Sequence, residues 1–115
     1  MDHQEIIKQI YDAFNKRDID AVFTFFHPGV VWPNGWKGGY VRGHDEVRDY
    51  WTRQWQELDP IVTPVKSTAI NNKIIEVDVK QIVKNLQGDV IADGMVKHTY
   101  AFDDGLVMKM EIGTN

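Results

Sequence analysis

The sequence predicts a single α+β domain, in which helices from the first half of the chain cover an antiparallel sheet from the second half. Three observations indicate this class. Apolar residues recur at helical spacing before residue 60, the period changes to two after it, and three turn signals divide the second half into strands. No repeat, linker or low-complexity tract interrupts residues 1–115, so we expect one folding unit.

Three helices are expected in the first half. The first contains the segment from Ile7 to Phe14, whose apolar residues have the i, i+3, i+4, i+7 spacing of one helix face. The second is short, begins after a capping Asp18 and stops at residues 27–29, His-Pro-Gly. The third runs from about Asp45 to Leu58 and ends before a proline.

Strands are expected on both sides of the third helix. Residues 30–32 read as a short strand that leads into a Gly-rich loop. Beyond residue 60, turn residues at 71–72, 86–89 and 103–105 divide the chain into four strands. Successive hairpins of this kind make a meander, whose apolar face needs cover from the helices.

Two polar side chains interrupt the apolar rows of these strands. His98 lies in the row of Val96 and Tyr100. An imidazole there must find a hydrogen-bond partner and titrates near neutrality where water reaches it, so His98 is a candidate acid, base or carbonyl-polarising donor. The alternative is a core histidine, satisfied by a backbone carbonyl or a tyrosine hydroxyl. Three interpretations of Gln81 stay open. It is the cross-strand neighbour of His98, it is a second polar group that faces a cavity, or it has no function and is tolerated in the packing at a sheet edge.

Asp93 is a further candidate, but its position depends on the backbone. By strict alternation it lies on the outer row, where it would be a solvated carboxylate. A β-bulge at Gly94 would turn the carboxylate towards the interior. Asp93 and His98 would then share one pocket as a base and its orienting or proton-sharing partner.

The four tryptophans suggest the wall of a pocket for a ring or a chain. Trp51 and Trp55 are one helical turn apart and share a face, while Trp32 ends the short strand before the loop. Trp36, within the Gly-rich loop, is a candidate lid or interface residue. Aromatic residues at helical spacing are also typical of a plain core, so both interpretations stay open.

Composition narrows the function classes. The absence of cysteine excludes disulfides, thiolate metal sites and a cysteine nucleophile. A net charge of −4 without a basic run argues against nucleic acid or a membrane surface as partner, and no apolar run is long enough to span a bilayer. The polar, acidic start of the chain indicates a cytoplasmic protein. No histidine spacing fits a metal motif and no glycines fit a phosphate loop, so we expect neither metal nor cofactor.

Four segments together carry a family resemblance. They are Ile10–Val22, His27–Trp32, Gly43–Trp51 and His98–Phe102, in an order that covers nearly the whole chain. These segments resemble the SnoaL-like members of the nuclear transport factor two superfamily, which also holds ketosteroid isomerase. The resemblance implies a cone-shaped α+β barrel, with the helices packed on a curved, mostly antiparallel sheet that encloses a cavity. It also implies a homodimer through the outer face of the sheet.

The resemblance further implies roles for particular residues. His98 stands where the isomerase has an oxyanion-binding aspartate, and Trp51 falls near a pocket tyrosine. Tyr11 lies one residue from the position of the oxyanion-binding tyrosine. The isomerase base has no counterpart, because residues 32–34 contain no carboxylate. SnoaL-like cyclases use a small His and Asp acid–base set under an aromatic cavity, which His98 and Asp93 would supply.

We therefore expect a cofactor-independent acid–base lyase, isomerase or cyclase that acts on a small apolar, carbonyl-bearing molecule, with His98 and Asp93 as catalytic residues. The alternative is a non-catalytic dimeric protein that binds a small apolar molecule. The residues expected to bind the substrate are Trp32, Trp51, Trp55, Gln81, Tyr11, Phe14 and Tyr100.

Overall fold

The computed structural model describes residues 1–113, which form three helices and one six-stranded sheet. The strand order in the sheet is β2-β1-β6-β5-β4-β3. Along the chain the elements are α1 (His3–Asn15), α2 (Ile19–Phe23), β1 (Phe26–Pro33), β2 (Tyr40–Arg42), α3 (Gly43–Trp55), β3 (Leu58–Ala69), β4 (Ile74–Asn85), β5 (Val90–Asp103) and β6 (Leu106–Gly113). No helix within these residues is long and apolar enough to cross a membrane.

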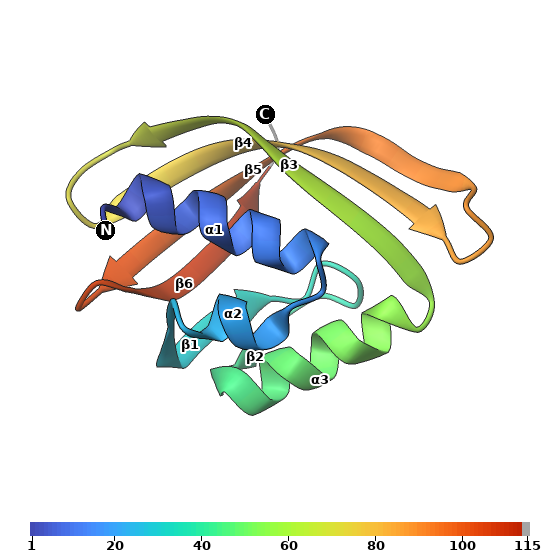
Figure 1. Cartoon of the computed structure of the whole chain (residues 1–115), viewed down its shortest axis with the longest axis horizontal. Coiled ribbons are helices and arrows are strands. Elements are labelled where there is room, and N and C mark those ends of the chain that lie inside the picture. The colour runs from blue at the N-terminus through green and yellow to red at the C-terminus, as the bar shows by residue number, and fades with distance from the viewer. Residues whose placement is uncertain (114–115) are drawn as a thin grey trace.

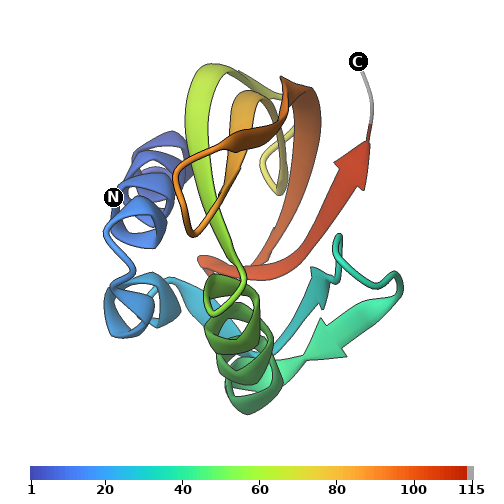
Figure 2. The ribbon, with the colours of Figure 1, turned by 90° about the vertical axis from the view of Figure 1, so that its right-hand side faces the viewer.

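The sheet is mixed, curved and open. Neighbouring strands pair antiparallel except β1 and β6, which run parallel. The long strands β3, β4 and β5 arch over α1, while α2 and α3 lie beside β1 and β2 (Figure 1). The edge strands β2 and β3 do not pair with each other, so the sheet curves around the helices without closing (Figure 2). The expected α+β fold with a curved, helix-covered sheet is confirmed. The sheet is open and does not close into the expected barrel.

The helices begin where the sequence predicts a cap. The Asp2 carboxylate accepts a hydrogen bond from the Glu5 N–H at 2.8 Å, and the Asp18 carboxylate accepts one from the Ala21 N–H at 3.2 Å. Each bond satisfies an amide that the first helical turn leaves free. The buried residues of α1 are Ile6, Ile7, Ile10, Tyr11 and Ala13.

Three element boundaries differ from the sequence-based expectation. Helix α2 ends at Phe23, and the expected helix stop at residues 27–29 lies within β1. Helix α3 ends at Trp55, because β3 already begins at Leu58 and pairs there with β4. Tyr40 and Val41, expected as loop, pair with β1 and form the edge strand β2 together with Arg42. In each case pairing with a distant strand satisfies the backbone groups, a contact that local periodicity does not reveal.

A β-bulge in β6 changes which of its residues face the core. Strict alternation predicts Leu106, Met108 and Met110 on one face. The register with β5 shifts between Val107 and Lys109, which leaves Met108 as the extra residue. Val107 and Met110 are therefore both buried, whereas Leu106 and Met108 are only half-buried.

The C-terminal end of α1 is fastened to the edge strand β3. Asn15 Nδ2 donates to the Val62 carbonyl at 2.7 Å, and the Val62 N–H donates to Asn15 Oδ1 at 3.1 Å. The guanidinium of Arg17, a residue in the left-handed region at φ 63°, pairs with the Asp59 carboxylate and donates to the Pro60 carbonyl at 2.8 Å. These contacts hold the start of β3 against α1.

We expect Asn15→Ala to lower the free energy of unfolding by about 1–2 kcal/mol, because it leaves both backbone groups of Val62 without their partner. Urea denaturation followed by circular dichroism measures this change. Asn72→Ala is the matched control, since Asn72 is exposed in the turn between β3 and β4. Equal stabilities of the two variants would contradict the assigned role of Asn15.

Candidate functional site

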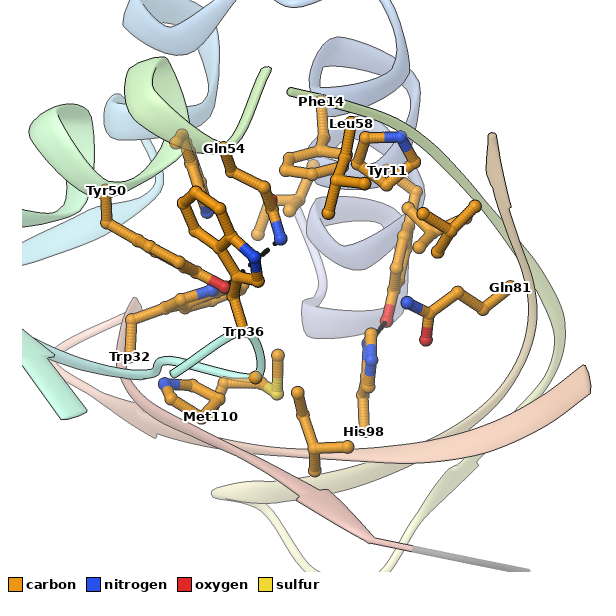
Figure 3. Close-up of a pocket in the computed structure, with 18 of the residues that line it drawn as sticks. Tyr11, Phe14, Trp32, Trp36, Tyr50, Gln54, Leu58, Gln81, His98 and Met110 are labelled. Carbon is orange, nitrogen blue, oxygen red and sulfur yellow. Dashed lines mark hydrogen bonds between the residues drawn. The ribbon is translucent and has the colours of Figure 1, made fainter. Parts of the chain in front are cut away.

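A cavity of about 320 Å³ lies between the concave face of the sheet and helices α1 and α3 (Figure 3). This volume falls at the lower end of the range of small-molecule sites, about 300–1,000 Å³. Most of the lining is apolar, and polar side chains reach it at only a few points. The aromatic residues of the wall are Tyr11, Phe14, Trp32, Trp36, Tyr50, Trp51 and Tyr100.

Tyr11 and His98 form a hydrogen-bonded pair in the wall of this cavity. The Tyr11 hydroxyl oxygen lies 2.6 Å from Nδ1 of His98, and the two rings are stacked with centroids 5.9 Å apart. Both residues are deeply buried, with 3% of Tyr11 and 6% of His98 exposed. Tyr11 comes from α1 and His98 from β5, so only the packing of the helix on the sheet brings them together.

Burial keeps both members of this pair neutral near pH 7. It lowers the pKa of His98 to about 4, because a buried imidazolium loses its hydration. Burial also raises the pKa of the Tyr11 hydroxyl well above its usual value, and the neighbouring Tyr100 adds to that effect. The hydroxyl of Tyr100 is a further hydrogen-bond partner of Tyr11. The two neutral phenols and the neutral imidazole hold three protons among them, and their two mutual hydrogen bonds use two. In either tautomer one O–H or N–H is therefore left for a ligand.

Gln81 supplies a second polar group on the same side of the cavity, where its side chain lies beside the Tyr11–His98 pair (Figure 3). Gln81 is not the cross-strand neighbour of His98. Its partner in β5 is Gly94, whereas His98 pairs with Val77 in β4 and Ile112 in β6. Of the interpretations of Gln81 that the sequence leaves open, its position matches the polar group that faces a cavity.

Tyr50 and Gln54 form a further polar pair, contributed by α3. Gln54 Nε2 donates to the Tyr50 hydroxyl at 3.4 Å, and Tyr50 is only 8% exposed. Burial raises the pKa of Tyr50, while the backbone N–H groups of Gly35 and Trp36 and the Gln54 amide oppose this effect. The hydroxyl therefore stays protonated near neutral pH.

The model of the SnoaL-like domain family matches residues 7–110 of the chain. This protein belongs to the SnoaL-like domain family. None of the curated proteins matches it.

Solved structures show how widely the fold of this SnoaL-like domain occurs. An NTF2-like protein of unknown function from Burkholderia pseudomallei is 22% identical, with a TM-score of 0.85 over 97% of this chain and 89% of its own. TerC, co-crystallised with polyporic acid, is 24% identical, with a TM-score of 0.84 over 96% and 89%. Rv0760c from Mycobacterium tuberculosis, in complex with estradiol-17beta-hemisuccinate, is 14% identical, with a TM-score of 0.83 over 97% and 92%. At these identities the likeness shows a common fold.

The structure of the SnoaL-like domain gathers most of the residues that the sequence singled out. Those that line the cavity are Tyr11, Phe14, Trp32, Trp51, Gln81, His98 and Tyr100. Tyr11 reaches His98 although it is offset by one residue from the position that the family resemblance implies. A tyrosine hydroxyl thus satisfies His98, as the core interpretation expects, while His98 also faces the cavity, as the functional interpretation requires.

Asp93 lies outside this cavity, on the opposite face of the sheet. Its carboxylate is half exposed and forms an ion pair with Lys80 at 2.6 Å. The register between β4 and β5 shifts around Ile91, and Gly94 is regularly paired, so no bulge turns the carboxylate inwards. Of the two positions that the sequence allows, Asp93 therefore occupies the solvated one.

Trp55 also does not line the cavity, although it lies on the same helix face as Trp51. It packs behind the wall, with its ring 5.4 Å from that of Phe14 and 6.0 Å from that of Trp51. The Arg17 guanidinium lies 4.9 Å from the Trp55 ring centroid. Trp36, expected as a lid or interface residue, does line the cavity.

Sequence reasoning overlooked Tyr50, Gln54 and Met110 as cavity residues. Tyr50 and Gln54 carried a usable signal, because two polar groups four residues apart lie on the inward face of a predicted helix. Met110 had no such signal, since an apolar residue on a buried row looks the same whether it meets a cavity or a packed core.

The buried His98 predicts that the fold is sensitive to acid. Its pKa is lowered to about 4 in the folded protein and is about 6.5 in an unfolded chain, so the unfolded state binds an extra proton between these values. We expect the free energy of unfolding to fall by about 3 kcal/mol as the pH drops through this window and not to change further through this group below it. Urea denaturation at fixed pH values measures the dependence.

In His98→Gln this fall in the free energy of unfolding between pH 6.5 and 4 should disappear, because the titrating group is gone. His27→Gln, a change outside the cavity, should retain it. A His98→Gln protein whose stability falls between pH 6.5 and 4 as steeply as that of the wild type would show that His98 is not the group responsible.

Proposed function

We propose that this protein is a cofactor-independent enzyme of the lyase, isomerase or cyclase kind, acting by acid–base chemistry on a small apolar molecule that carries a carbonyl group. The supporting observation is the neutral Tyr11–His98 pair in the wall of an aromatic cavity. A preorganised donor beside a carbonyl oxygen stabilises the negative charge that develops when the neighbouring carbon loses a proton.

The pair holds the two groups that such a step needs. When His98 Nδ1–H and the Tyr100 O–H both donate to the Tyr11 oxygen, the Tyr11 O–H is free to donate to the ligand carbonyl, and Nε2 of His98 has a free lone pair. The C–H bond next to the carbonyl then breaks, Nε2 takes the proton, and the oxygen keeps the negative charge against the Tyr11 O–H. The imidazolium afterwards returns the proton to another atom of the ligand. Gln81, beside the pair, orients it or the substrate.

Proteins of the same fold support a small-molecule role for the cavity. TerC was co-crystallised with polyporic acid, Rv0760c is in complex with a steroid derivative, and a computationally designed neighbour binds 17-OHP. The flat aromatic walls formed by Phe14, Trp32 and Trp51 suit a ring-bearing ligand in this chain as well.

A second candidate function is a binding protein that does no chemistry. It is favoured by one observation: no carboxylate belongs to the cavity lining among residues 1–113, and Asp93 lies outside it. His98 alone, with its pKa lowered to about 4, is a weak base. Native mass spectrometry, with extraction of any bound molecule, distinguishes the two functions. A ring-bearing carbonyl compound supports the enzyme, and an aliphatic lipid without a reactive carbonyl supports the binding protein.

Proton exchange at the carbon next to a carbonyl tests the proposed chemistry directly. We expect the wild-type protein to accelerate incorporation of deuterium from D₂O into 2-tetralone, as followed by NMR. His98→Gln and Tyr11→Phe should each reduce this acceleration by about 10²–10⁴-fold, the usual contribution of a positioned acid or base. Tyr40→Phe is the control, because Tyr40 is exposed and lies outside the cavity.

Binding is measured in parallel from the quenching of tryptophan fluorescence, since Trp32, Trp36 and Trp51 line the cavity. Bound 2-tetralone without accelerated exchange would favour the binding protein. Accelerated exchange that persists in both variants would show that the Tyr11–His98 pair does not carry the chemistry.

We also propose a homodimer through the outer face of the sheet. Ile61 and Ile82 are paired across β3 and β4 on that face, and Met95, on the same face, is 43% exposed. The neighbouring Lys80–Asp93 ion pair places both signs of charge beside this apolar strip, which allows two identical faces to complement each other.

Sedimentation velocity tests this assembly. The wild type should sediment as a dimer, and Ile82→Glu should shift it to monomer, because the change buries a charge at the centre of the interface. Ile70→Glu, in the exposed turn between β3 and β4, should leave the dimer intact. A wild type that stays monomeric at the highest attainable concentration would contradict the proposal.

A further inference from the structure

The polar groups of the cavity form two separate clusters that face each other. Tyr11, Gln81 and His98 lie on one side, and Tyr50 and Gln54 on the other (Figure 3). The wall between them is apolar and aromatic, with Phe14, Trp32 and Met110 among its residues. The proposed chemistry uses only the first cluster, so the Tyr50–Gln54 pair has no part in it.

The Tyr50 hydroxyl is placed to donate a hydrogen bond into the cavity. Gln54 Nε2 donates to its oxygen at 3.4 Å, and the backbone N–H groups of Gly35 and Trp36 also lie near it. Within residues 1–113, no side-chain hydrogen bond has Tyr50 as the donor. Tyr50 is 8% exposed, and its oxygen points into the cavity (Figure 3). A buried O–H of this kind strongly favours an acceptor supplied by a ligand.

We propose that Tyr50 and Gln54 form a second polar subsite, which binds an uncharged oxygen at the far end of the ligand. The ligand of this cavity is then an elongated ring system with a hydroxyl or carbonyl oxygen at each end. One oxygen meets the Tyr11–His98 pair and the other meets the Tyr50–Gln54 pair. The inference rests on the proposed function for the placement of the first oxygen.

The surroundings of the second subsite disfavour an anionic end group. Tyr50 and Trp36 also line an outer cleft on the other side of the loop that connects β1 and β2. The charged residues of this cleft are Lys37, Asp45, Glu46, Asp49, Arg53 and Glu57, in which the carboxylates are in excess. One of the two cations, Arg53, is already paired with Asp49 at 3.0 Å. A carboxylate on the ligand would meet this negative potential, whereas a hydroxyl or carbonyl would not.

Matched probe pairs test the second subsite. The first pair is 2-naphthol and 2,6-dihydroxynaphthalene, and the second, longer pair is 4-phenylphenol and 4,4′-dihydroxybiphenyl. Within at least one pair, we expect the compound with two hydroxyls to bind about 3- to 10-fold more tightly, the factor that one hydrogen bond of ordinary net strength contributes. We expect 6-hydroxy-2-naphthoate to bind more weakly than 2,6-dihydroxynaphthalene. Calorimetric titration gives the dissociation constants.

Tyr50→Phe should abolish the preference for the second hydroxyl. Tyr11→Phe should weaken both members of a pair by a similar factor and preserve the preference. Gln54→Leu is the second variant, in case Tyr50→Phe does not fold, and it should reduce the preference. Tyr40→Phe controls for the loss of a tyrosine hydroxyl outside the cavity.

The outcomes separate this inference from the proposed function. Equal affinities within both probe pairs, or a preference that survives in Tyr50→Phe, would overturn the second subsite and leave the Tyr11-dependent binding intact. The preference for the second hydroxyl could be lost in Tyr50→Phe while Tyr11→Phe leaves the affinities unchanged. This result would support the second subsite and contradict the role of the first. If none of the four phenols binds, both proposals fall.

Discussion

The hydrogen bond between Tyr11 and His98 ties the helical layer to the sheet in the interior of the molecule. Each partner is buried so deeply that, left alone, it would cost about 1–3 kcal/mol for an unsatisfied polar group. The bond therefore fixes the rotation of α1 about its axis, and with it the residues that α1 presents to the cavity. Because burial also keeps both groups neutral, the same bond that orders the core leaves a proton donor in an apolar chamber. The structural role of His98 and its proposed chemical role thus depend on one interaction.

The cavity exists because the sheet curves while its edges stay apart. An open sheet has no ring of hydrogen bonds to hold its shape, so the edge strand β3 is held by side chains from the α1 end, with Asn15 bonded to Val62 and Arg17 to Asp59. Aromatic side chains span the remaining space at ring-to-ring distances of about 5–6 Å, for example Phe14 against Trp51 at 5.1 Å. Such walls are stiff and flat, which suits ring-bearing ligands. The polar groups of the cavity lining are few and, among the described residues 1–113, all are uncharged near neutral pH, so a ligand in this cavity would meet hydrogen-bond partners and no ion-pair partner.

Much of the fold could be predicted from the sequence, because its evidence is local. The 3.6-residue period of α1, the period of two in β4 and β5, and the turn residues between strands all act over a few neighbouring positions. The parallel pairing of β1 with β6 could not be predicted in this way, since the paired segments lie at opposite ends of the chain and have no shared pattern. The same holds for β2, a strand of three residues whose hydrogen bonds exist only because β1 lies beside it. The cytoplasmic location expected from the N-terminal residues stays a prediction.

The residues of the candidate site differ in the same way, because local patterns predict some of them and only non-local contacts decide the others. His98 and Gln81 stand out in the sequence because a polar side chain on an apolar row violates a local period, and the structure places both in the cavity. The side of the sheet on which Asp93 lies depends on where β5 shifts its register against β4, and a single bulge decides this through non-local pairing. The sequence by itself determined which residues are chemically unusual. Only the tertiary structure decided which of them meet, because a hydrogen bond such as that of Tyr11 with His98 requires two elements far apart in the chain to be packed to within a fraction of an ångström.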